Sequence, residues 1–143
     1  MTEQPTKNKR LIVLVVSAIV ALSLTLIFYY SFKDPVADKE MTELVAKYNE
    51  NCPLIIQDGI RLESVSLPIE KVVQYNLTLL NVKKETAEIQ VIKENIEQSL
   101  VSTTKANPGL KVFRDNNYTL IYNYKDIKGD FMFEIKIVPE QYK

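Results

Sequence analysis

Residues 118–138 read YTLIYNYKDIKGDFMFEIKIV and predict two β-strands joined by a short loop. Apolar and polar residues alternate in both halves, which is the period of a strand with one buried face. That face would carry Tyr118, Leu120, Tyr122 and Tyr124 in the first strand, and Phe131, Phe133, Ile135 and Ile137 in the second. Because the loop between them is short and contains Gly129, we expect the two strands to pair as an antiparallel hairpin.

The segment before this hairpin predicts a long helix and then a short strand. Residues 84–105 place apolar side chains at helical spacing, and Pro108-Gly109 marks the end of the helix. The apolar stripe consists of Ile89, Ile92, Ile96 and Leu100, with Thr103 as a further candidate. We expect residues 110–113 to form a short strand that precedes the hairpin.

Two more strands and another helix are predicted nearer the N-terminus. Residues 72–82 alternate as a half-buried strand, and residues 60–67 form a second strand-like run after a turn at Gln57-Asp58-Gly59. A helix is expected from Asp34-Pro35 to about Asn51. Its apolar face consists of Met41, Leu44, Val45 and Tyr48.

The predicted order of elements is therefore α-β-β-α-β-β-β. Consecutive strands with short connections favour antiparallel pairing, and helices cover a half-buried sheet on one side. We predict a two-layer α+β domain with an antiparallel sheet of about five strands and two helices.

An uninterrupted apolar stretch lies at residues 11–32, LIVLVVSAIVALSLTLIFYYSF, without charge, proline or glycine. As a helix it would be about 33 Å long, enough to cross a hydrocarbon core of about 30 Å. We predict an uncleaved, single-pass transmembrane anchor. The alternatives are a cleaved signal peptide, whose apolar region is usually shorter and ends in small residues, and a buried core helix.

Charges beside this stretch predict its orientation. Lys7, Lys9 and Arg10 precede it, and basic residues favour the cytoplasmic side of a membrane. We predict a cytoplasmic tail at residues 1–10 and a soluble extracytoplasmic α+β domain at residues 33–143.

The composition argues against several classes of function. The chain has no histidine, which is the commonest general base and metal ligand near neutral pH. After residue 33, acidic side chains outnumber basic ones, so the domain lacks the basic surface that nucleic acids require. We predict a protein without catalytic residues, metal, cofactor or nucleic-acid partner; an enzyme with carboxylate or tyrosine chemistry is the alternative.

Cys52 and the loop at residues 126–130 each allow two interpretations. The single cysteine lies at a predicted helix end, where carbonyl dipoles raise a thiol pKa, so we interpret it as a packing residue. An intermolecular disulfide is the alternative. The loop is interpreted as a solvated turn, and a calcium site is the alternative, although the spacing of an EF-hand loop is missing.

Two strand faces are candidate binding surfaces. One is the polar face of Gln74, Asn76 and Thr78, for which plain solvent exposure is the alternative. The other contains Tyr118, Tyr122 and Tyr124, because tyrosines suit interfaces. For these rings, a position in the core under the helices is the favoured interpretation.

These observations predict a membrane-anchored module that binds another protein or assists assembly. The open edge of an antiparallel sheet, which can pair with another chain, supports this interpretation. A homo-oligomer is a further alternative. The alternative is a domain that senses a small molecule or lipid in a pocket lined by Tyr75, Phe131 and Phe133.

Overall fold

The structure is a computed structural model that describes residues 36–143, with side chains from Lys39 onward. The predicted tail at residues 1–10 and the predicted anchor at residues 11–32 lie outside the described residues. Within residues 36–143, none of the helices combines the length and the apolar character needed to span a bilayer. Residues 40–143 form one compact unit.

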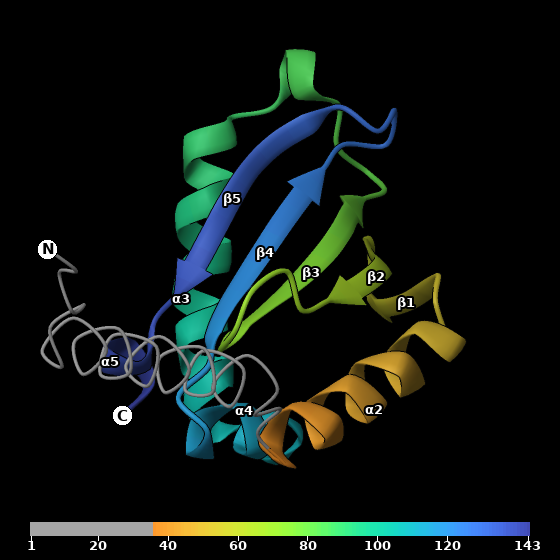
Figure 1. The fold of residues 1–143 in the computed structure, drawn as a ribbon. Coiled ribbons are helices and arrows are strands. Elements are labelled where there is room, and N and C mark those ends of the chain that lie inside the picture. The colour runs from red at the N-terminus through yellow and green to blue at the C-terminus, as the bar shows by residue number, and fades with distance from the viewer. Residues whose placement is uncertain (1–35) are drawn as a thin grey trace, which may run out of the picture. The chain divides into compact units, whose positions relative to one another are not determined.

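A five-stranded sheet forms the centre of this unit (Figure 1). In both sequence and space the order is β1 (Leu54–Gln57), β2 (Ile60–Ser66), β3 (Val72–Leu79), β4 (Thr119–Lys125) and β5 (Phe131–Ile137). All neighbours are antiparallel except β3 and β4, which are parallel, with Val72 beside Thr119 and Thr78 beside Lys125. The α+β class is confirmed, but the prediction of a purely antiparallel sheet is wrong because a helical crossover joins β3 to β4.

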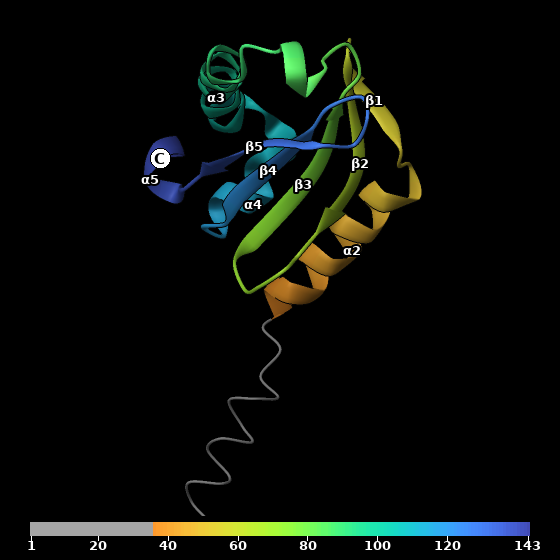
Figure 2. The same ribbon diagram turned by 90° about the horizontal axis from the view of Figure 1, so that it is seen from above.

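Helices and helical turns make up most of the other described residues, 36–143 (Figure 2). They are α2 (Val36–Glu50), η1 (Lys84–Thr86), α3 (Ile89–Ala106), η2 (Pro108–Leu110), α4 (Lys111–Asp115) and α5 (Pro139–Tyr142). The predicted helices correspond to α2 and α3. The first ends as expected, whereas the second begins later because η1 precedes it.

The expected strand at residues 110–113 is wrong, since these residues enter α4. Asn107 accepts a hydrogen bond from the Gly109 N–H at 2.8 Å, which starts the helical turn η2. The turn runs directly into α4, and Phe113 then packs fully into the core. Arg114 of α4 donates to the carbonyl of Thr104 at 2.7 Å, so the short helix also satisfies the end of α3.

One core contains the faces that the alternation predicts. Its buried apolar residues are Met41, Val45, Leu62, Val65, Val73, Tyr75, Leu77, Leu79, Phe113, Tyr118, Leu120, Tyr122, Tyr124, Met132, Phe133, Ile135, Ile137 and Tyr142. The predicted apolar stripe of α3, Ile89, Ile92, Ile96 and Leu100, is only partly buried against this core. Two expectations fail at the margins, because Phe131 is exposed and Thr104, rather than Thr103, is the buried threonine of α3.

Two different elements line the outer edge of β2. β1 pairs with its first half, where Leu54 lies opposite Leu62. Farther along, the Asn49 side chain of α2 both donates to the Val65 carbonyl and accepts from the Val65 N–H, each at 2.8 Å. Asn49 therefore takes the place of a strand partner where β1 has ended.

Candidate functional site

The outer strand β1 exposes three consecutive aliphatic side chains. Leu54, Ile55 and Ile56 are 46%, 55% and 52% exposed, although apolar residues of this size are usually buried. Among residues 36–143, β1 pairs only with β2, so its other edge is the edge of the described sheet. The site therefore combines exposed apolar surface with an open strand edge.

A groove of about 270 Å³ lies beside β1 on the core face of the sheet. Its floor is formed by Ile60, Leu77, Tyr122 and Tyr124 from three strands, and Ile56 stands at its edge. These residues belong to the predicted half-buried faces, so the groove continues the core toward the open edge of the sheet.

Helix α3 forms the opposite wall of the groove. Ile96 and Leu100 contribute apolar surface, while Asn95 and Ser99 place polar groups along the wall. Gln57 adds another amide at the β1 side. None of the residues that line the groove is charged, and apolar surface with a few uncharged polar groups is typical of sites that bind apolar ligand groups.

The predicted tyrosine surface lies in the core. Tyr118, Tyr122 and Tyr124 are all buried, as the favoured interpretation predicts. Tyr122 stacks on Tyr75 with ring centroids 4.9 Å apart. Burial, which disfavours the phenolate, raises the pKa of Tyr122 to about 12. Tyr122 and Tyr124 supply part of the floor of the groove, not an exposed patch.

Gln74 and Asn76 of the predicted polar strand face form a hydrogen-bonded row with Ser64. Gln74 donates to Asn76 at 3.2 Å, and Asn76 donates to Ser64 on β2 at 2.9 Å. Thr78 is buried, whereas Gln74 and Asn76 are half-buried. This row lies on the face opposite Tyr122, so the structure does not bring the two candidate surfaces together. As a binding surface the row stays a prediction.

Asp126 holds the β4–β5 loop to the start of η1. Its carboxylate accepts the backbone N–H groups of Lys84, Lys128 and Asp130, each at 2.9 Å. The hydrogen bond from Lys84 is the main cause that holds its pKa below the ordinary value. The expected turn is present, but Asp126 is buried, not solvated. The carboxylate oxygens that would have to bind a calcium ion already accept hydrogen bonds from three N–H donors, which favours the turn interpretation over a calcium site.

Cys52 follows α2 and is partly buried against the core. Its thiol donates to the Tyr48 carbonyl at 3.3 Å. Burial and then the Glu63 carboxylate raise its pKa, which agrees in direction with the sequence-based expectation. Both observations favour the packing interpretation.

The described residues show no metal-ligand cluster, and the residues expected to line a ligand pocket do not line the groove beside β1. Within residues 36–143, no three acidic or cysteine side chains are grouped in a way that could hold a metal ion. Of the expected pocket residues, Tyr75 and Phe133 are buried and Phe131 is 53% exposed. The three do not line the groove beside β1.

Sequence reasoning missed the groove because its parts come from distant segments. The run Leu54-Ile55-Ile56 before the Asp58-Gly59 turn was a visible signal of a strand. However, such a run usually indicates burial. Only the position of β1 at the edge, and of α3 over the other side of the sheet, leaves these residues exposed.

Comparison with solved structures finds the same fold in bacterial proteins. The type 2 secretion system pilotin EpsS of Vibrio vulnificus has a TM-score of 0.61 at 6% identity, over 75% of this chain and 92% of that chain. PA3611 of Pseudomonas aeruginosa has a TM-score of 0.58 at 11% identity, over 76% and 98% of the two chains. The type II secretion pilotin AspS of Vibrio cholerae has a TM-score of 0.54 at 14% identity, over 69% and 85%. At these identities the likeness concerns the fold alone.

No curated protein matches this chain in sequence. Residues 35–133 match DUF8479, a domain of unknown function. The matched segment contains α2, the first four strands, the groove and the start of β5. The chain therefore belongs to the DUF8479 family.

Proposed function

We propose that this chain is a non-enzymatic protein-binding or assembly module. The observation that carries the proposal is the uncharged groove beside β1, together with the exposed aliphatic side chains of β1, Leu54, Ile55 and Ile56. Exposed apolar patches on soluble domains often mark sites that bind other molecules. Two fold neighbours are secretion-system pilotins, which supports an assembly role at the level of fold.

The chemistry of the groove supports binding more than catalysis. Tyr122 and Tyr124 are its titratable side chains, and burial raises both of their pKa values. A general acid or base works best with a pKa near the working pH. Two neutral phenols on an apolar floor are therefore suited to contact a ligand and unsuited to transfer protons at neutral pH.

A small molecule or lipid is the second candidate ligand. The groove supports it through its apolar floor, but its volume of about 270 Å³ lies below the usual range of about 300–1,000 Å³. The exposed strand beside the groove would also stay uncovered by such a ligand. A protein partner would cover both.

The proposal includes the membrane anchor at residues 11–32, with the N-terminus cytoplasmic and the domain extracytoplasmic. It is supported by the length and apolar character of this stretch and by the basic residues ahead of it. Such an anchor would hold the groove close to other membrane proteins and raise the effective concentration of a partner.

Site-specific photocrosslinking of the full-length chain tests the binding role. A benzophenone side chain placed at Ile56 or Asn95 is expected to capture a defined protein in cells that make this chain. The same group at Lys136, which is exposed on β5, serves as the control. Equal yields from groove and control positions would contradict the proposal, and a copurifying small molecule in native mass spectrometry would favour the second candidate.

A further inference from the structure

The two faces of β1 are both apolar and both exposed. Leu54 pairs with Leu62 on the core face, whereas Ile55 pairs with Arg61 and so points to the opposite face. Ile56 returns to the groove side, where it lines the groove. A ligand confined to the groove would cover Ile56 and leave Ile55, which is 55% exposed, in water.

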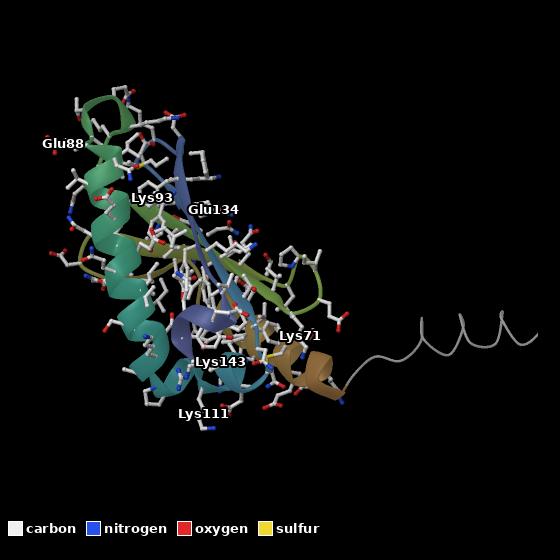
Figure 3. The ribbon with its side chains drawn as sticks, turned by 90° about the vertical axis from the view of Figure 1, so that its left-hand side faces the viewer. Lys71, Glu88, Lys93, Lys111, Glu134 and Lys143 are labelled. Atoms are coloured by element: carbon white, nitrogen blue, oxygen red, sulfur yellow. The ribbon has the colours of Figure 1, made fainter. Side chains whose placement is uncertain are left out.

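The opposite edge of the sheet differs in its chemistry. β5 carries Glu134 and Lys136 as exposed side chains, and charged residues on an edge strand oppose pairing with another chain. Figure 3 looks onto this side of the molecule and labels Glu134 beside α3, which packs along β5. β1 has no charged residue. Of the two edges, β1 is therefore the one open to an added strand.

The charge of the site restricts the ligand. None of the groove-lining residues is charged. On the other face, Arg61 is paired with Glu63 at 2.7 Å, so the charged side chain opposite Ile55 already has an ionic partner. A charged ligand segment would lose its hydration here without gaining an opposite charge. The site fits an uncharged segment with aliphatic side chains.

We propose that β1 binds an extended, uncharged, aliphatic segment of another protein, which adds to the sheet as an outer strand. Its backbone pairs with the open edge, and its alternate side chains cover Ile56 in the groove and Ile55 on the opposite face. β1 is only four residues long, follows Pro53 and contains a register shift between Ile55 and Gln57, so the paired segment is short. This inference rests on the proposed protein-binding function.

Crosslinking from both faces of β1 tests strand addition. Benzophenone at Ile55 and at Ile56 of the full-length chain is expected to attach to the same short segment of the same protein. Ile69 is the matched control, because it is 70% exposed in the loop at the far end of β2. Capture from Ile56 and Asn95 without Ile55 would mean a groove-bound helix, and it would overturn strand addition while the binding function stands.

Two other outcomes are equally decisive. Attachment to a second copy of this chain would overturn the assignment to a different protein. Absence of capture from Ile55, Ile56 and Asn95 would overturn both the inference and the proposed function.

Substitutions give an independent measurement of the same inference. Ile55→Lys is expected to lower capture from Ile56 by about tenfold, the effect of losing one strong interface contact. Ile69→Lys should leave the yield unchanged, and circular dichroism of both variants checks that the fold is retained. Equal yields from the two variants would overturn the inference. The captured segment can then be synthesised as two peptides, with N-methyl groups on its odd or on its even residues. Only the peptide whose N-methyl groups replace the N–H groups that face β1 should lose binding.

Discussion

Asn49 shows how one exposed side chain can complete a sheet edge. Its amide makes two hydrogen bonds of 2.8 Å with the backbone of Val65. Asn49→Ala is expected to lower the free energy of unfolding by about 1–3 kcal/mol, because both backbone groups lose their partner. Asn51→Ala removes one exposed hydrogen bond to Lys47 and is the control, with little change expected. Urea unfolding of the two full-length variants measures the difference, and equal midpoints would contradict this role.

Asp126 predicts a dependence of stability on acid pH. Hydrogen bonds to the carboxylate, first from Lys84, lower its pKa below the ordinary value of 3.8. Its contribution is therefore present above pH 3.8 and lost as the pH falls through the lower pKa of the folded state. Asp126→Asn should reduce stability at neutral pH and flatten the decline between about pH 4 and 2. Thermal unfolding across this range measures it, with Asp130→Asn as control, since only the backbone of Asp130 takes part.

The buried tyrosines predict that the stability of the fold also depends on alkaline pH. Burial raises the pKa of Tyr122 to about 12 and raises the pKa of Tyr75 well above 10. In the unfolded chain these phenols ionise near pH 10, so stability should fall as the pH rises from about 10 toward 12. Absorbance of tyrosinate should show a late, unfolding-linked phase among the eight tyrosines. Tyr122→Phe should shrink that phase, and an unchanged phase in this variant would contradict the assignment.

At the scale of elements, α2 is held mainly by two buried side chains. Met41 is fully buried and Val45 is 8% exposed. Met41→Ala is expected to cost about 2–5 kcal/mol of unfolding free energy, because a cavity remains where the side chain was. Lys47→Gln on the exposed side of the helix should change stability by less than about 0.5 kcal/mol. Denaturant unfolding of both variants decides whether α2 belongs to the cooperative core, and similar midpoints would show that it does not.

Sequence patterns predicted the elements whose periodicity is local. The faces of β3, β4 and β5 alternate as expected, apart from the exposed Phe131 and the buried Thr78 and Met132. The sequence patterns failed at residues 110–113. The apolar pair Val112-Phe113 does not distinguish a strand from a short helix that is started by Asn107. The parallel pairing of β3 and β4 was also missed, since strand direction depends on the route of the intervening helix and not on the pattern of either strand.

The difference between local sequence patterns and the arrangement of distant segments also explains which parts of the candidate site could be predicted. The burial of Tyr122 and Tyr124 could be expected from alternation within β4. The exposure of Ile55 and Ile56 could not, because it depends on which strand lies at the edge and on how far α3 reaches across the sheet. Sites assembled from distant segments leave little trace in local periodicity.

At the scale of the whole molecule, the anchor gives a direct prediction. The full chain should stay in the membrane pellet after alkaline carbonate extraction, and a variant without residues 11–32 should move to the supernatant. With Cys52→Ser as background, Lys143→Cys should react with an impermeant maleimide in intact cells and Thr2→Cys should not. Release of the full chain, or labelling at position 2 alone, would contradict the proposed anchor or its orientation.

The parallel junction of β3 and β4 also bears on how the chain reaches its native state. β1–β2–β3 and β4–β5 are each neighbours along the chain, so each group can form from contacts close in sequence. The two groups can pair only after α3 and its flanking turns, which lie between them in the sequence, have been synthesised. Pairing them closes a long loop. Until then β3 is itself an unpaired edge. We therefore expect the emerging N-terminal half to be the form most prone to aggregation, protected only once the last two strands have emerged.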